Sequence, residues 1–156
     1  MSTHSFSWND VVPRDWNVAE IIRAGVDRVE LAKFQHSVDV AGQALVARTF
    51  TQQEIAFCAG RVHCLATRFA AKEAAAKVLG TGFRGLGWRE IEVLTSPDGE
   101  PRLVLHGRAG DRARNLGITS IGLSLTHTSV AAEAFVVALC RVPAAEQHIH
   151  QETNLH

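Results

Sequence analysis

Five stretches of the chain alternate hydrophobic and polar residues, and this alternation predicts β-strands. They are residues 20–27, 89–95, 101–106, 118–127 and 130–139. The first strand delivers Asp27 at its end. The second and third flank a Pro-Asp-Gly turn and predict a hairpin. The last two predict another hairpin, with His127 and Thr128 at its turn.

Apolar residues at helical spacing predict four helices. They cover residues 28–38, a segment beginning at Thr51, residues 61–79 and residues 107–117. Thr51 and Glu54 have the spacing of a capping box, and Gly80 stops the long third helix. Because helices and strands mix without βαβ alternation, the pattern indicates a compact α+β domain.

The two ends of the chain show no sustained pattern. We expect an N-terminal extension (residues 1–19), one domain (residues 20–141) and a C-terminal tail (residues 142–156). The formal net charge is zero, so the molecule as a whole has no basic field of the kind that drives nucleic-acid binding. No signal peptide or membrane-spanning stretch is evident, and the three cysteines have no metal-ligand spacing. We expect reduced thiols in a cytoplasmic protein.

Glu73 is an acid in an unexpected place on the long helix. On a helical projection it falls about 40° from Phe69, inside the stripe of apolar residues. A carboxylate there is costly to desolvate unless it is paired or bound to a metal. An i,i+4 salt bridge to Lys77 is one explanation, and a metal ion is the other.

Asp27 favours the metal, although an acid at this position could equally cap the following helix. Two carboxylates with open positions suit Mg²⁺, which fills its other positions with water and phosphate oxygens. Three cations and three glycines nearby suit an anionic phosphate. These are Arg68, Lys72, Lys77, Gly80, Gly82 and Gly85. The residues alone therefore indicate a possible magnesium and phosphate site.

Several motifs in order resemble one enzyme family. They are AGVDRVEL (24–31), TFTQQE (49–54), RFAAKEAAAKVLGTG (68–82), WREIEVL (88–94), GEPRLVLHG (99–107) and SLTHTSVAAEAFVVA (124–138). From about residue 20 to 140 the chain is similar to holo-acyl-carrier-protein synthase, the small stand-alone type of 4′-phosphopantetheinyl transferase. The resemblance implies that family's fold, an antiparallel sheet packed with a long central helix.

The resemblance also implies a reaction and its residues. The family moves the phosphopantetheine arm of coenzyme A onto a serine of an acyl carrier protein and releases adenosine 3′,5′-bisphosphate. Asp27 and Glu73 match its Mg²⁺ ligands, and Lys77 matches a cation that stabilises phosphate charge. The positions that match its coenzyme A contacts are Arg68, Phe69, Lys72, Lys77, Gly82, His127 and Thr128. Either Glu73 or a metal-bound water would accept the serine proton.

The carrier protein is expected to dock on the helix that follows Asp27. Lys33 and Arg48 are the basic residues available there, fewer than the family normally offers. Arg23 replaces a glycine that usually stands four residues before the aspartate. Family members are typically homotrimers. Two other readings remain: a Mg²⁺-dependent hydrolase of coenzyme A-type pyrophosphates, and a non-catalytic carrier-binding domain.

Overall fold

The computed structural model describes residues 19–142. Its elements are β1 (Ala19–Glu30), α1 (Leu31–Thr49), α2 (Gln52–Cys58), α3 (Val62–Leu79), the 3₁₀ turn η2 (Trp88–Glu90), β2 (Ile91–Thr95), β3 (Pro101–Leu105), α4 (Gly107–Asn115), β4 (Ile118–His127) and β5 (Ala131–Val142). The predicted extension and tail, apart from Ala19 and Val142, lie outside the described residues. Among residues 19–142, no helix combines the length and apolar character needed to cross a bilayer.

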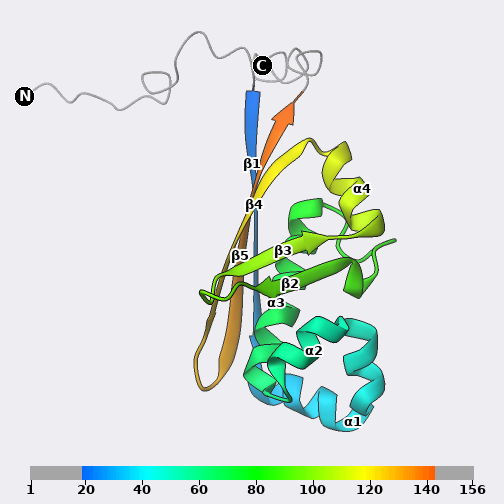
Figure 1. The fold of residues 1–156 in the computed structure, drawn as a ribbon, viewed down its shortest axis with the longest axis vertical. Coiled ribbons are helices and arrows are strands. Elements are labelled where there is room, and N and C mark those ends of the chain that lie inside the picture. Colours follow the sequence, from blue (N-terminus) through cyan, green and yellow to red (C-terminus); the bar gives the residue numbers. More distant parts are fainter. Residues whose placement is uncertain (1–18, 143–156) are drawn as a thin grey trace, which may run out of the picture.

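Two antiparallel sheets form the β part of this α+β fold. The larger has the strand order β1-β5-β4, and β2 pairs with β3 in a separate hairpin. In Figure 1 the long strands run along one side of the molecule, with α3, the β2–β3 hairpin and α4 on the other side. Both predicted hairpins are confirmed.

The helix α3 is the centre of the core. Of its 18 residues 13 are buried, because it packs against both β1 and β5 and is covered by α1, α2 and β2. Six alanines with almost no exposed surface line it: Ala66, Ala70, Ala71, Ala74, Ala75 and Ala76. Its predicted end is confirmed, since Gly80 adopts the left-handed conformation (φ 78°) that closes a helix.

Gly25 lets β1 approach α3 closely. A Cβ atom at this position would lie 2.1 Å from the carbonyl oxygen of Ala74, so no side chain fits. The alanines of α3 have small side chains, so they too allow a neighbouring backbone to come close to the helix. Strand and helix backbones therefore meet almost directly, and this contact fixes how Asp27, two residues after Gly25, lies relative to Glu73, which precedes Ala74.

The first strand is longer than its alternation predicts. β1 continues through Asp27 to Glu30, where α1 begins at Leu31, so residues 28–30 are strand and not helix. Asp27 thus sits inside the strand, opposite Ala134, and does not cap a helix. The physical reason is that β5 supplies hydrogen-bonding partners for β1 as far as Glu30, which outweighs the local helical spacing.

The capping box is confirmed. The Thr51 hydroxyl accepts a hydrogen bond from the Glu54 backbone N–H, and the Glu54 carboxylate accepts one from the Thr51 N–H at 2.8 Å. Both residues also bind outside their helix. Thr51 donates to Glu92 at 2.6 Å, and Glu54 accepts from the Val93 N–H at 2.9 Å, so the start of α2 is tied to β2.

We expect Gly25→Ala to destabilise the protein by about 1–3 kcal/mol or more, because the added methyl group must push strand and helix apart. Gly122→Ala on β4 is the matched control, since a Cβ there meets nothing within 4 Å. Chemical denaturation of both variants measures the difference. Equal stability of the two variants would show that the contact is not tight.

Candidate functional site

Asp27 and Lys77 meet where β1 crosses the C-terminal part of α3. The Lys77 ammonium donates to a carboxylate oxygen of Asp27 at 2.9 Å and to the backbone oxygen of Val26 at 2.6 Å. An ammonium has three N–H donors, so one remains for a ligand. The Lys77 side chain is about half exposed, so a ligand in solvent can reach it.

Glu73 lies one helical turn before Lys77. Within residues 19–142 its carboxyl group makes no ion pair, so the i,i+4 salt bridge to Lys77 does not form; Lys77 pairs with Asp27 instead. Burial raises the pKa of Glu73, and the negative charge of Asp27 raises this pKa further, against the opposing effect of Lys77. The two acids are therefore close enough to interact, which the sequence alone could not show.

The position of Glu73 corrects the helical projection. Glu73 is only half-buried, and it lies on a narrow strip of α3 with Phe69 and Lys77. Almost every other face of α3 is covered, because its alanines let neighbouring elements pack on all sides. An amphipathic projection with one apolar stripe does not describe such a helix. The acid stands at the edge of the core, not within it.

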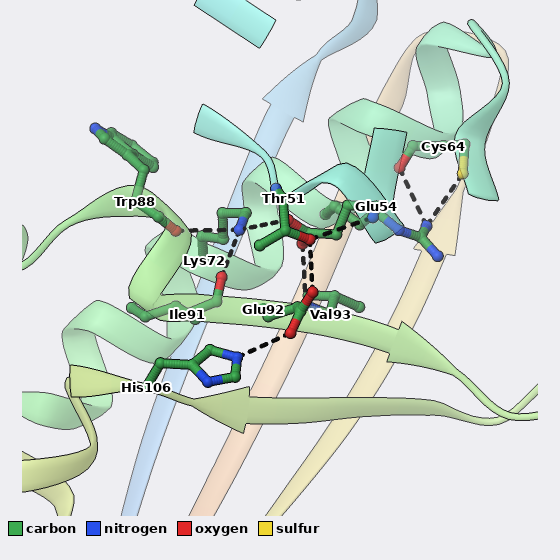
Figure 2. Close-up of polar contacts among 10 residues, drawn as sticks. Thr51, Glu54, Cys64, Lys72, Trp88, Ile91, Glu92, Val93 and His106 are labelled. Carbon is green, nitrogen blue, oxygen red and sulfur yellow. Dashed lines mark hydrogen bonds and ion pairs between the residues drawn. The ribbon is translucent and has the colours of Figure 1, made fainter. Parts of the chain in front are cut away.

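Lys72 is the charge that the core actually encloses. Its side chain has no exposed surface and neither has that of Glu54, with which it forms an ion pair at 2.8 Å. The ammonium also donates to the backbone oxygens of Trp88 and Ile91, so its three donors are satisfied (Figure 2). Burial lowers the pKa of Lys72. This arrangement differs from the expected coenzyme A contact, because Lys72 joins α3 to α2 and β2 inside the protein.

We expect Lys72→Met to lower the free energy of unfolding by about 3–5 kcal/mol, because it leaves the buried Glu54 carboxylate without its cation. Lys33→Met, which removes an exposed pair with Glu30, should change stability by less than about 1 kcal/mol. Denaturant unfolding compares the two. If Lys72→Met keeps wild-type stability and only weakens coenzyme A binding, Lys72 is a ligand contact after all.

Arg68 is also enclosed. Its guanidinium donates to the backbone oxygen and sulfur of Cys64 and to the Thr95 hydroxyl at 2.9 Å, and it stacks over the Phe57 ring at 4.4 Å. Its Nε has no hydrogen-bond partner among the described residues. Burial lowers the pKa of Arg68. The structure thus holds Arg68 beneath the surface, and a contact with coenzyme A stays a prediction.

Cys58 and Cys64 correct the expectation of three reduced thiols. They form a disulfide across the turn between α2 and α3, where their Cα atoms lie 5.4 Å apart. Cys140 is a free, buried thiol. The pairing could not be derived from the sequence, because it depends on how tightly the chain turns between the two helices.

Phe69 belongs to a row of aromatic rings beside the acids. It packs on Phe34 at 5.5 Å and stacks on Trp88 at 4.9 Å, and Trp88 stacks in turn on Phe83. Phe69 and Phe34 also line a groove of about 290 Å³ together with Val29, Lys33 and Leu45. This groove lies along α1. On β1 it is lined by Val29, two residues after Asp27.

Among the described residues, the other predicted contacts form no hydrogen bond or ion pair with Asp27, Glu73 or Lys77. Gly82 is exposed in the turn after α3, with φ 54°. Thr128 fixes the β4–β5 turn by accepting hydrogen bonds from the N–H groups of Val130 and Ala131. His127, at the exposed end of β4, stacks on His63 at 4.8 Å. Sequence reasoning missed His63 as a neighbour of His127, because it lies near the start of α3, far from His127 along the chain.

The pairing register relates His127 to Asp27. Asp27 lies opposite Ala134, and His127 lies opposite Ala132 on the other side of β5. Two strand spacings and two residues separate them, so their Cα atoms are about 12 Å apart. A small cofactor headgroup could not touch both, but an extended nucleotide-bearing molecule could.

The available ligand residues suit Mg²⁺ better than a metal ion that is bound by protein side chains alone. Residues 19–142 hold no group of three or more His, Cys, Asp or Glu that could bind an ion alone. Two neighbouring carboxylates are what Mg²⁺ uses when substrate phosphates and water complete its shell. Glu73 forms no ion pair in the described part of the chain, and burial and the charge of Asp27 raise its pKa, so a bound cation would favour its ionised form.

Comparisons with known proteins agree with the fold. Residues 23–140 match the family model of the 4′-phosphopantetheinyl transferase superfamily. Holo-[acyl-carrier-protein] synthase from Herpetosiphon aurantiacus is 43% identical over 122 residues, which cover 74% of this chain and 96% of the relative. The crystal structure of the synthase from Neisseria meningitidis has a TM-score of 0.68 and 36% identity, covering 74% of this chain and 96% of that one.

A synthase structure from Helicobacter pylori, in complex with coenzyme A, has the same TM-score of 0.68 at 28% identity. It covers 74% of this chain and 98% of that one. The similarity therefore extends over nearly the whole length of each relative and over the described part of this chain.

Proposed function

Because the chain belongs to the 4′-phosphopantetheinyl transferase superfamily, we propose that it is a holo-[acyl-carrier-protein] synthase. It transfers the 4′-phosphopantetheine arm of coenzyme A to a serine hydroxyl of an apo-acyl carrier protein and releases adenosine 3′,5′-bisphosphate. The observation that carries this proposal is the meeting of Asp27, Glu73 and Lys77 at the crossing of β1 and α3. Family membership alone would not require the charged residues to be assembled.

Asp27 and Glu73 would hold Mg²⁺, which when bound supplies Lewis acidity and neutralises charge on the pyrophosphate. Lys77, fixed by Asp27 and the Val26 carbonyl, directs its remaining N–H toward a phosphate oxygen and stabilises the charge that develops during transfer. Glu73 is the candidate base for the serine proton, directly or through a water molecule, because burial and the negative charge of Asp27 raise the pKa of its carboxyl group.

We expect wild-type protein, coenzyme A and Mg²⁺ to increase the mass of an apo-acyl carrier protein by one phosphopantetheine arm. Glu73→Gln and Asp27→Asn should each lower kcat/KM by at least about 100-fold, because each removes a ligand and a charge from the site. Mass spectrometry of the carrier measures transfer, and circular dichroism verifies that the variants are folded.

Asp111→Asn is the control for this experiment, because it neutralises an exposed acid on α4 that pairs only with Arg114 among the described residues. Consumption of coenzyme A without carrier would identify a hydrolase instead. Full turnover by a folded Glu73→Gln variant would remove Glu73 from the mechanism.

The outer face of the larger sheet supports assembly into the expected homotrimer. Ile22, Val26 and Phe135 lie on this face with 69, 57 and 46% of their surface exposed. Val26 and Phe135 are directly opposite each other, and the ion pair between Arg28 and Glu133 borders them. An apolar patch of this kind on a sheet is typical of a protein–protein contact, and a second copy of this chain is its proposed occupant.

We expect Ile22→Glu to dissociate the assembly into 17.0 kDa monomers, because it buries a charge in the contact. Val40→Glu adds the same charge at a 73% exposed position of α1 and should leave the assembly intact. Light scattering coupled to size exclusion gives both masses. A monomeric wild-type protein would refute the trimer. A cytoplasmic location stays a prediction.

A further inference from the structure

A second pocket, of about 600 Å³, opens at the C-terminal end of α1. Three arginines from three separate elements line it: Arg48 from α1, Arg89 from η2 and Arg108 from α4. Glu90 is the one acid in its lining. The pocket therefore carries an excess of positive charge, although the formal charge of the whole chain is zero.

Hydrogen bonds hold Glu90 and Arg108 of this pocket in place, while the other two arginines form no ion pair among the described residues. The Glu90 carboxylate accepts hydrogen bonds from the Gly87 N–H at 2.8 Å and from Arg108 at 3.0 Å. These bonds lower the pKa of Glu90 and keep it ionised. Within residues 19–142, neither Arg48 nor Arg89 has an acid partner, and both are exposed. The guanidinium groups of Arg48 and Arg89 are thus available to bind a ligand.

The pocket adjoins the groove beside the candidate active site. Leu45 lines the groove and Arg48, one helical turn later on α1, lines the pocket. Phe69 lines the groove and Trp88 lines the pocket, and their rings stack at 4.9 Å. The two hollows therefore lie on either side of one aromatic pair. A protein seated over the groove, close to Asp27, would reach the arginines as well.

Apart from Arg48, the surface of α1 supplies little free positive charge. Lys33 is paired with Glu30 at 3.0 Å, and Asp39 is a further exposed acid on the same helix. Guanidiniums bind carboxylates through paired, charge-assisted hydrogen bonds, so the arginine pocket is the better match for an acidic surface.

We propose that the carrier protein docks carboxylate side chains onto Arg48, Arg89 and Arg108 while its serine reaches the site at Asp27 and Glu73. This docking rests on the proposed transferase function. It extends partner recognition from α1, the helix that the sequence indicated, to η2 and α4. Arg108 holds Glu90 through its Nε atom, and its other N–H groups contact the partner together with Arg48 and Arg89.

The test measures transfer to an apo-acyl carrier protein by the full chain. Arg48→Glu and Arg89→Glu should each raise the KM for the carrier about tenfold, and the KM for coenzyme A should stay within about twofold. Arg114→Glu is the control, because it makes the same charge reversal on the exposed surface of α4 outside the pocket, and it should change neither KM. Titration calorimetry of carrier binding without coenzyme A accompanies the kinetics.

The two measurements separate failure of the docking from failure of the function. If the wild-type protein binds the carrier without transferring to it and the variants lose binding, the docking holds and the transferase assignment fails. If the variants bind the carrier as tightly as wild type, the docking is overturned. A thermal midpoint raised by inorganic phosphate in wild type alone, with unchanged carrier KM, would instead identify a small-anion pocket.

Discussion

The direct contact between the backbones of β1 and α3 is the constraint on which the site depends. Gly25 has no room for a side chain against the Ala74 carbonyl, and alanines on α3 let neighbouring elements close in on the helix. Helix and sheet ordinarily pack through interleaved side chains, and a layer of that kind would hold their backbones apart. Here the close approach lets Lys77 reach the Asp27 carboxylate and the Val26 carbonyl, and it brings Glu73 within the electrostatic influence of Asp27. The chemistry of the site thus follows from the smallness of residues that take no part in it.

The two lysines of α3 have different roles: Lys72 is structural, and Lys77 belongs to the candidate site. Lys72 and Lys77 are five residues apart, so they point about 140° away from each other around the helix. Lys72 enters the core, where Glu54 and two backbone oxygens satisfy it, and it holds α2, α3 and β2 together. Lys77 stays at the surface, where its contacts leave one donor unused. The C-terminus of α3 is held by two further cations, since Arg23 donates to the Val78 carbonyl at 2.7 Å and Arg112 to that of Leu79 at 3.0 Å. Arg23, where the resemblance expects glycine, therefore stabilises the helix end beside the site.

The proposed surfaces of the molecule do not compete for space. The apolar residues proposed to join copies of the chain lie on the outer face of the larger sheet, at Ile22, Val26 and Phe135. The arginine pocket is formed by α1, η2 and α4, which lie on the other side of that sheet (Figure 1). Self-association through the sheet would therefore leave the pocket and its neighbouring groove open. The apolar surface proposed for assembly is thus separate from the arginine pocket proposed for partner recognition. The acids of the site lie between these two surfaces.

The sequence by itself determined the hairpins, the capping box and the end of α3 at Gly80, because periodicity and turn residues are local signals. It singled out Asp27 and Glu73 through motif matches but could not show that they meet, because they lie on different elements. It misjudged the end of β1, since pairing with β5 overrides the helical spacing of residues 28–30. It could not separate Lys72 from Lys77, or see that Glu73 stands at the edge of the core, because burial depends on which elements cover a helix. The Cys58–Cys64 disulfide, the stacking of His63 on His127 and the convergence of three arginines were likewise decided by the tertiary structure. Each joins residues from different elements, and no spacing along the chain encodes such a meeting.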